Sequence, residues 1–233
     1  KMGMVDGPNL VTDGLVAYLD AGNVQSYPGS GTTWYDIVGS INGTATGSPT
    51  FNSADGGHFV MDGTDDYFQF DATTTAPLVT STGSLCFWIN LDNVAQYRGI
   101  LMIYDASYTD YLVLRCDGTT IRLLIENNNV QVLGLYTSSL TSHLGNWIYL
   151  VATQNGTNAT WYINASQDTT VVDASWIAEA CSSATNTSLR IGYSSWASNY
   201  MDGKLAIVQV YNRALSTTEI TQNFNAHKSR FGL

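Results

Sequence analysis

Charged side chains are scarce in this chain of 233 residues, and positive ones are the scarcest. Charged residues make up 12% of the sequence, with 9 Lys and Arg against 19 Asp and Glu, so the formal net charge is −10 at pH 7. The few Lys and Arg residues form no cluster that could follow a phosphate backbone. Nucleic acid and anionic membranes are therefore not expected as partners.

Cysteine and long apolar segments are also scarce. The three cysteines, Cys86, Cys116 and Cys181, are far apart and odd in number, so they neither complete a disulfide framework nor match the ligand spacing of a zinc site. Buried free thiols are their expected state. The longest apolar runs are well short of the roughly 20 residues that a membrane-spanning helix needs. The sequence thus predicts no membrane partner.

Short β-type runs, separated by Gly, Asn, Asp and Ser, fill most of the chain. This pattern is typical of a β-sandwich or barrel. Because all-β sandwiches reach roughly 200–250 residues as one unit, residues 1–233 are expected to form a single domain. Asn155-Gly156 predicts a tight antiparallel hairpin between its flanking runs. The clearest runs are Leu15–Leu19, Tyr67–Phe70, Leu85–Leu91, Ile100–Tyr104, Tyr111–Cys116, Ile121–Glu126, Val130–Leu135, Trp147–Thr153, Ala159–Asn164, Leu189–Gly192 and Leu205–Tyr211.

One helix is expected, near the end of the chain. Ser216 and Glu219 have the spacing of a capping box, in which each side chain bonds the backbone of the other residue. Ile220 and Phe224 follow at the spacing of one apolar helix face. A short helix over about residues 217–226 should therefore pack these two side chains onto the sandwich.

Four segments of the sequence together carry a family resemblance: Gly14–Asn23, Phe59–Tyr67, Gly145–Asn164 and Met201–Ser216. In this order along the chain, they resemble laminin-G-like modules of the concanavalin A-like lectin/glucanase superfamily. The resemblance implies an all-β fold, a two-sheet antiparallel jelly-roll sandwich, with a short C-terminal helix added.

Two further stretches, Ser26–Trp34 and Arg230–Leu233, resemble laminin-G-like domains in structural proteins of tailed, often marine, bacteriophages. This resemblance implies a non-catalytic carbohydrate-binding or display domain on a virion surface, such as a capsid decoration, tail or fibre component. Its partners would be a glycan on a host or particle surface and other virion proteins, and its location the virion surface or the extracellular space. Two alternatives remain open: a purely structural capsid or tail protein without glycan binding, and a secreted carbohydrate-binding module.

The sequence lacks the carboxylate pattern of a glycosidase. Such enzymes place two carboxyl groups roughly 5–9.5 Å apart across the scissile bond, and the hydrolases that the chain resembles carry them as Glu-x-Asp-x-x-Glu on one strand. That pattern is absent, and the glutamates Glu126, Glu179 and Glu219 are widely separated. The three histidines are solitary. The protein is therefore not expected to be an enzyme.

The segment from Asp62 to Asp66 is the best candidate for a metal site. Asp62, Asp65 and Asp66 place three carboxylates next to a glycine, and carboxylates are the hard oxygen ligands that Ca²⁺ prefers. Asp20 or Asp202 from neighbouring segments would complete the ligand set. The alternative is a solvated turn between two strands.

Two aromatic groups in polar segments are candidate glycan sites. Sugar recognition combines an aromatic ring against the C–H surface of the sugar with Asp or Asn groups that fix hydroxyls. The alternative for each ring is a core anchor at the base of a loop. The first group is Trp196, Asn199 and Tyr200, and the second is Tyr108, Asp110 and Tyr111.

Overall fold

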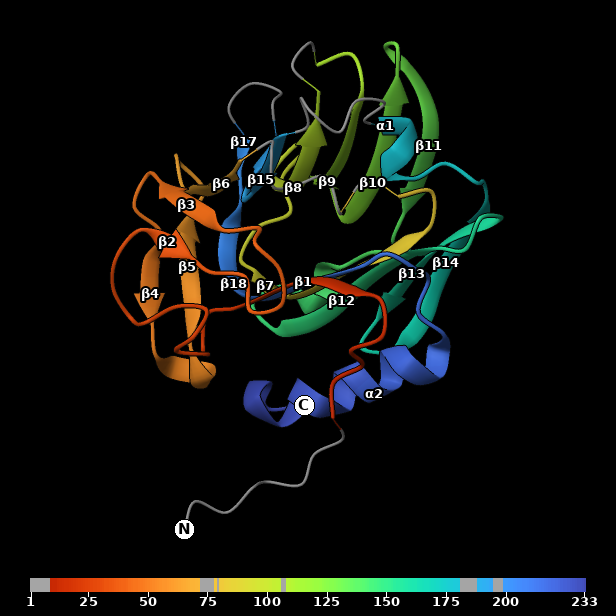
Figure 1. Ribbon diagram of the computed structural model, residues 1–233. Helices are drawn as coiled ribbons and strands as arrows, with labels where there is room; N and C mark the ends of the chain where they lie inside the picture. The colour runs from red at the N-terminus through yellow and green to blue at the C-terminus, as the bar shows by residue number, and fades with distance from the viewer. Residues whose placement is uncertain (1–8, 72–77, 79, 106–107, 181–187, 195–198) are drawn as a thin grey trace.

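The computed structural model describes residues 9–71, 78, 80–105, 108–180, 188–194 and 199–233 (Figure 1). These residues form two large antiparallel sheets that pack face to face, so the predicted all-β sandwich is confirmed. Within the described ranges, each of these sheets has eight strands. None of the described helices has the length and apolar character needed to cross a membrane.

The first sheet is organised around β18, which pairs with β7 on one side and with β1 and β5 on the other. The predicted hairpin is confirmed between β12 and β13, where the Asn155 amide donates to the Asn158 carbonyl and Gly156 has a φ of 88°. In order across this sheet the strands are β14 (Ser166–Val172), β13 (Asn158–Ile163), β12 (Trp147–Gln154), β7 (Gly83–Leu91), β18 (Asp202–Tyr211), β5 (His58–Asp62) and β4 (Thr50–Asn52), with β1 (Leu15–Asp20) beside β18.

The second sheet packs against the first, and its side chains alternate between the core and the outer face. On its strand β9, Leu112 and Leu114 face the core between the sheets, whereas Val113 faces outward. Its strands, in order, are β11 (Val130–Tyr136), β10 (Thr120–Asn127), β9 (Tyr111–Asp117), β8 (Gly99–Tyr104), β15 (Ser188–Ile191), β6 (Tyr67–Phe70), β3 (Gly43–Thr46) and β2 (Thr33–Trp34). A separate two-stranded hairpin consists of β16 (Tyr193–Ser194) and β17 (Asn199–Tyr200).

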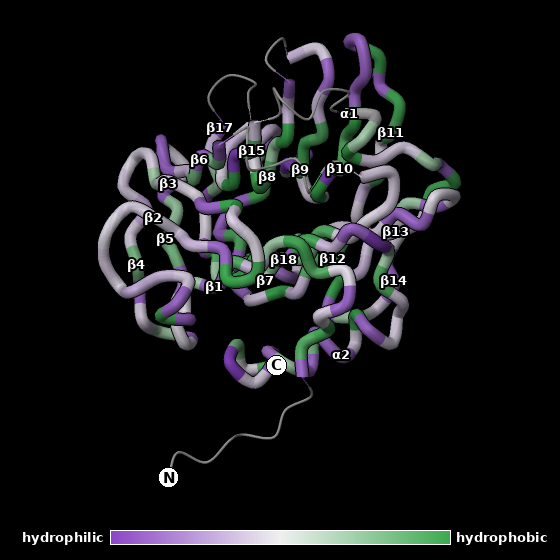
Figure 2. The backbone as a smooth tube through the Cα atoms, in the orientation of Figure 1, coloured by the Kyte–Doolittle hydropathy of each residue, from purple (hydrophilic) through white to green (hydrophobic). Residues whose placement is uncertain are grey.

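The core lies between the two sheets, where Figure 2 shows the hydrophobic positions of the central strands. Trp34, Phe59 and Trp161 are fully buried there. Cys116 belongs to this core and Cys86 to the cluster on the other face of the first sheet; both are buried free thiols. Burial raises the pKa of both thiols to about 12, which makes them unreactive at neutral pH. Cys181 lies outside the described residues.

Helix α2 (Thr217–His227) covers the face of the first sheet that points away from the core (Figure 1). The predicted capping box is confirmed, because the Ser216 hydroxyl accepts from the Glu219 amide and the Glu219 carboxylate accepts from the Ser216 amide. Ile220 is buried against the sheet, as predicted, and Phe224 is half-buried. A short helical turn, η4 (Lys228–Phe231), follows α2, and its Phe231 packs against the same face of the first sheet. The remaining short helices are η1 (Ala54–Gly56), η3 (Thr141–His143) and α1 (Ile177–Ala180).

Candidate functional site

The outer face of the second sheet carries aromatic and positively charged side chains. On β15, Leu189 and Ile191 face the core, so Arg190 between them points outward. Arg190 is in register with Gln69 on β6 and with Met102 on β8. Because paired positions share one face of a sheet, the outward side chains of three strands meet around Arg190.

Arg190 lies at the centre of a group of tyrosines. Its guanidinium carbon is 4.7 Å from the ring centre of Tyr193, 5.2 Å from that of Tyr67 and 5.4 Å from that of Tyr104. A cation within about 6 Å of an aromatic ring is attracted by the negative face of the ring. The Nε of Arg190 donates to Oε1 of Gln69 at 2.5 Å, which fixes the orientation of the guanidinium plane.

Two further tyrosines extend this group on opposite sides. The ring of Tyr200 lies 5.4 Å from that of Tyr193 and 6.2 Å from that of Tyr67. The ring of Tyr108 stacks on that of Tyr104 at 4.5 Å with an interplanar angle of 15°. We call the whole group the tyrosine–arginine cluster: Tyr67, Gln69, Tyr104, Tyr108, Arg190, Tyr193 and Tyr200.

The β16–β17 hairpin positions two of these tyrosines, because Tyr193 and Tyr200 are register partners in it. The hairpin lies directly against β8 at Gly99, where an added Cβ would be 2.1 Å from the Tyr193 carbonyl carbon and 2.2 Å from the Ser194 nitrogen. The Ser194 hydroxyl also donates to the Tyr97 carbonyl at 2.6 Å. A close backbone approach that only glycine permits thus holds the hairpin on the sheet.

Tyr108 is the most exposed ring of the cluster, at 42% of its surface. Its φ of 56° is unusual for a tyrosine, and such backbone strain is found most often at functional sites. The hydroxyls of the half-buried Tyr193 and the buried Tyr104 stay protonated, because burial raises the pKa of Tyr193 and, more strongly, of Tyr104. At neutral pH the cluster therefore offers ring faces together with hydroxyl donors.

The structure divides the predicted glycan-binding residues. Tyr108 and Tyr200 belong to the tyrosine–arginine cluster, and Asn199 is half-buried beside Tyr200 on β17. Asp110 is buried at the base of its loop, where Oδ1 accepts from the Asn128 amide at 2.7 Å. Tyr111 is also buried. Two predicted ligands thus lie beneath the surface, and Trp196 is outside the described residues.

Two more arginines continue this face towards β11. The guanidinium of Arg115 on β9 lies 4.7 Å from the ring centre of Tyr97, and that of Arg122 on β10 lies 5.1 Å from the ring centre of Tyr136. Both tyrosines are exposed. Burial lowers the pKa of Arg115, and the positive charge of Arg122 lowers it further. The outer face of the second sheet is therefore a band of tyrosine rings with guanidinium groups among them.

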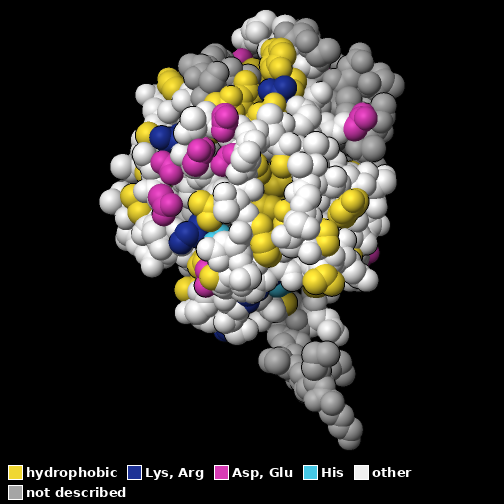
Figure 3. Space-filling model, turned by 90° about the vertical axis from the view of Figure 1, so that its left-hand side faces the viewer, with side chains coloured by type: hydrophobic (Ala, Val, Ile, Leu, Met, Phe, Trp, Pro, Cys, Tyr) yellow, Lys and Arg dark blue, Asp and Glu magenta, His cyan; other side chains and the backbone are white. Residues whose placement is uncertain are grey.

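The predicted metal ligands Asp62, Asp65 and Asp66 come together in an acidic cluster, in which one oxygen of each residue lies within 4.8 Å of the others. Acidic side chains gather on the side of the molecule shown in Figure 3. Asp66 is buried, and its two oxygens accept from the Ser48 amide at 2.7 Å and from the Asp62 amide at 3.1 Å. Burial raises the pKa of Asp66, and the neighbouring charges of Asp62 and Asp65 also raise it. Three carboxylates this close fit the oxygen chemistry of a calcium site.

The two remaining predicted metal ligands have protein partners. Asp202 is in register with Asp62, but its carboxylate lies 3.5 Å from Nη2 of Arg98. Arg98 also donates to the carbonyls of Gly63 and Tyr200, so it connects the acidic cluster to the tyrosine–arginine cluster. Asp20 is in register with Ile207 at another part of β18, and it forms an ion pair with Arg230. The structure thus keeps Asp202 beside the acidic cluster and separates Asp20 from it.

Calcium binding at the acidic cluster stays a prediction. With a dissociation constant of about 10 μM, about 1 mM Ca²⁺ would stabilise the fold by about 2.7 kcal/mol, which corresponds to a rise of roughly 5–10 °C in Tm. Asp65→Asn, which removes an exposed carboxylate of the cluster, should reduce this rise, and Asp13→Asn at another exposed position should not. Equal Tm values for metal-free protein in EDTA and in millimolar calcium would contradict the prediction.

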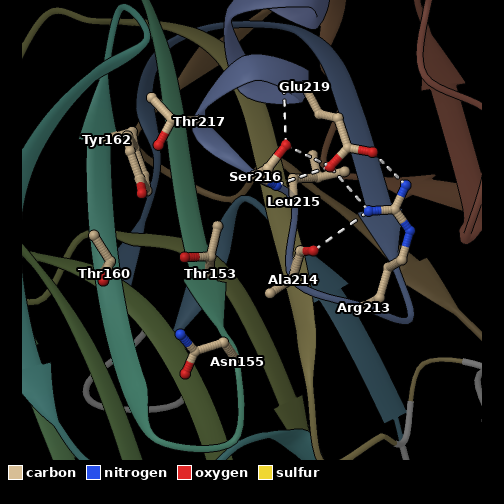
Figure 4. Close-up of a pocket in the computed structure, with 10 residues that line it drawn as sticks. All are labelled: Thr153, Asn155, Thr160, Tyr162, Arg213, Ala214, Leu215, Ser216, Thr217 and Glu219. Atoms are coloured by element: carbon tan, nitrogen blue, oxygen red, sulfur yellow. Dashed lines mark hydrogen bonds and ion pairs between the residues drawn. The ribbon is translucent and has the colours of Figure 1, made fainter.

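A separate pocket of about 560 Å³ lies on the outer face of the first sheet, beside the start of α2 (Figure 4). Thr153, Thr160 and Tyr162 line it from the sheet, and Ser216 and Glu219 from the helix. The Glu219 carboxylate accepts from both terminal nitrogens of the arginine at position 213 and from the Ser216 amide. These bonds lower the pKa of Glu219 to about 2. A general acid needs the opposite shift, so this pocket has no glutamic acid poised to protonate a leaving group.

A protein-family model described as the concanavalin A-like lectin/glucanases superfamily matches residues 62–221. The chain belongs to this superfamily. Its laminin-G-like character, predicted from the four sequence segments, is confirmed. No curated protein sequence matches the chain.

Solved structures with this superfamily's jelly-roll fold resemble the chain at low sequence identity. Domain 4 of AbnA, an extracellular arabinanase from Geobacillus stearothermophilus solved with arabinotriose, has a TM-score of 0.64 at 16% identity, covering 91% of this chain and 98% of that one. A botulinum neurotoxin type C structure, described as showing dependence of cell entry on two ganglioside molecules, has a TM-score of 0.68 at 14% identity. The binding domain of botulinum neurotoxin DC, solved with rat synaptotagmin II, has the same TM-score and identity. Both toxin matches cover 91% of this chain and 51% of theirs, so this chain spans about half of their length.

Sequence reasoning missed the arginine and two of the tyrosines at the centre of the site. Arg190, Tyr67 and Tyr193 all lie in strands, so none of them stands out as a loop residue. The available signal was period-two alternation, because Arg190 lies between two core residues and must point out of the sandwich. Alternation gives the face but not the neighbouring strand, which only the sheet order supplies.

Proposed function

We propose that this protein is a non-catalytic carbohydrate-binding domain and that the tyrosine–arginine cluster is its binding surface. The observation that carries the proposal is the position of Arg190, which joins the Tyr104–Tyr108 stack to Tyr67, Tyr193 and the β16–β17 hairpin. Tyrosines from three separate stretches of the sequence thus become one surface. The lectin-like fold of the superfamily supports the same proposal.

The chemistry of the cluster suits a sugar ring. Partly exposed tyrosine rings offer flat apolar faces to the C–H groups of a pyranose, and their hydroxyls can bond its hydroxyls. Gln69 lies on the same face, where its amide oxygen accepts from Arg190 and its amide nitrogen donates to the carbonyls of Phe70 and Leu189. A shallow surface of this kind should bind one glycan weakly, with a dissociation constant of about 0.1–1 mM. Many copies on one particle would raise the effective affinity.

Binding should depend on the exposed rings of the cluster. We expect Tyr108→Ala and Tyr200→Ala each to weaken glycan binding about tenfold, corresponding to about 1.4 kcal/mol, because each removes a ring face from the surface. Tyr35→Ala is the matched control, since Tyr35 is an exposed tyrosine at 45% and is not part of the cluster. Hits from a multivalent glycan array, followed by titration of each variant, measure the effect.

Three results would contradict the proposal in different ways. Unchanged affinity in Tyr108→Ala and Tyr200→Ala, with folding intact, would place the site elsewhere on the molecule. Absence of binding across a broad array at multivalent density would favour a purely structural role. Release of reducing sugar or of an unsaturated product during incubation with laminarin, alginate, agarose or xylan would identify an enzyme.

We also propose that the domain is displayed on a virion surface. The support is the resemblance of Ser26–Trp34 and Arg230–Leu233 to phage structural domains, together with the weak, copy-dependent binding expected of a shallow site. An antibody against the domain should label purified particles. Recovery of the protein only in the particle-free medium would favour a secreted carbohydrate-binding module.

A further inference from the structure

The six arginines of the chain fall into two groups by their partners. Three of them form ion pairs with carboxylates: Arg98 with Asp202 at 3.5 Å, Arg213 with Glu219 at 2.7 Å, and Arg230 with Asp20 at 2.7 Å. The other three are the arginines on the outer face of the second sheet, each lying over tyrosine rings. Of these three, Arg115 is buried and interacts with the opposite charge of Asp117, whereas Arg190 lies in the partly exposed tyrosine–arginine cluster.

Arg190 forms no ion pair with any carboxylate in the part of the chain that the structure describes. Its only hydrogen bond to a described residue runs from Nε to Gln69, which leaves the two terminal nitrogens pointing to no described partner. The guanidinium plane is held by that bond and by three tyrosine rings, so its donors are oriented before any ligand arrives.

Two carboxylates of this face lie on strands that are not beside β15. Glu126, at the far end of β10, is in register with Tyr111. Asp117, at the end of β9, interacts favourably with the charge of Arg115. Neither strand neighbours β15, which lies between β6 and β8. The positive charge of Arg190 is therefore not balanced by an outward carboxylate of the strands beside it.

From these contacts we propose that the tyrosine–arginine cluster binds acidic sugars, with the terminal nitrogens of Arg190 holding a carboxylate or sulfate group while the tyrosines hold the ring. This proposal rests on the glycan-binding function proposed above and names its ligand class. A planar guanidinium with two free donors matches the two oxygens of such a group. Partial burial among tyrosine rings strengthens the attraction, because the local dielectric is below that of water.

The test uses pairs of glycans that differ only in the anionic group. The probes are sialyllactose with lactose, oligogalacturonate with its carboxyl-reduced form, and a sulfated carrageenan oligosaccharide with its desulfated form. We expect the wild-type protein to bind the acidic member of at least one pair about tenfold more tightly or better, and 0.5 M NaCl to reduce this preference. A preference in the uronate or sialate pair would identify a carboxylate as the bound group, and a preference in the carrageenan pair would identify a sulfate.

Arg190→Gln should bring the preference to within about twofold while leaving affinity for the neutral member unchanged. Arg190→Lys keeps the charge without the planar fork, so it should retain part of the preference. Lys228→Gln is the matched control, because it removes one positive charge on the opposite side of the first sheet. If Arg190→Gln does not fold, the Arg190→Lys variant and the salt dependence of the wild-type preference still test the proposal.

The failures are distinguishable. Equal binding of acidic and neutral members, with Tyr108→Ala weakening both, would overturn the acidic-sugar inference and leave the glycan-binding proposal standing. The same would follow if Arg190→Gln weakened neutral and acidic members equally, because Arg190 would then only support the surface. No binding of either member of any pair, or on the broader array, would overturn both proposals.

Discussion

Replacing Arg230 with glutamine should lower the free energy of unfolding by about 3–5 kcal/mol, which is the cost of leaving a buried carboxylate without its partner. Asp20 is only 6% exposed, and its Oδ1 lies 2.7 Å from Nη1 of Arg230. Arg230 also donates to the backbone carbonyls of Asp55 and Gly57. One side chain from η4 thus links the C-terminal end to β1 and to the η1 turn, and no other residue in the described chain forms an ion pair with Asp20.

Chemical denaturation at 25 °C measures this loss, and a double-mutant cycle isolates the pair. Asp20→Asn together with Arg230→Gln should recover part of the stability lost in Arg230→Gln alone, because the double variant has no unpaired buried charge. Lys228→Gln, two residues away and without an ion pair in the described chain, should change stability by less than about 0.5 kcal/mol. A loss below about 1 kcal/mol in Arg230→Gln, or strictly additive effects in the cycle, would contradict the interpretation.

Asp20 also shows why the metal ligands could be predicted only in part. Asp62, Asp65 and Asp66 lie within one turn, so their proximity can be predicted from their spacing in the sequence. Arg230, the partner of Asp20, is 210 residues away in the chain, and no local sequence pattern predicts such a contact. Sequence spacing therefore found the acidic cluster and could not exclude a carboxylate that an arginine already neutralises.

The fold was predictable where short-range chemistry decides it. The capping box of Ser216 and Glu219 and the Asn155-Gly156 turn each specify a local conformation, and the structure confirms both. On β15, Arg190 lies between the core residues Leu189 and Ile191, so period-two alternation is enough to place it on the outer face. The order β8-β15-β6 was not predictable, because it places strands about 90 and 120 residues apart side by side.

The candidate site depends on that order. Tyr108 and Tyr200 stood out in the sequence because they occur in polar segments, and both lie in the tyrosine–arginine cluster. Arg190 gives no such local signal, yet it joins the two groups, because β15 lies between the strands that carry Tyr104 and Tyr67. A sequence can thus suggest exposed rings, whereas the charged group between them comes from the pairing of distant strands.

The second large effect is expected at Trp88, where Trp88→Ala should cost about 3–5 kcal/mol of stability. Trp88 is fully buried on β7, and it faces away from the core between the sheets. Its ring stacks on Phe231 at 4.3 Å, on Tyr149 at 5.2 Å and on Phe224 at 5.7 Å. The outer face of β7 carries the buried Cys86 and Trp88, and α2 with η4 covers these two side chains.

Removing the ring should therefore loosen α2 specifically, in addition to lowering global stability. Hydrogen exchange of the Thr217–His227 amides should accelerate more than that of the β9 and β10 amides, because those strands belong to the other sheet. Trp88→Phe keeps an aromatic ring and should cost clearly less. The Trp88 Nε1 has no hydrogen-bond partner among the described residues, so these losses report packing and not a broken hydrogen bond. A cost below about 1 kcal/mol, or unchanged exchange in α2, would mean that the helix is not what stabilises this face of the sheet.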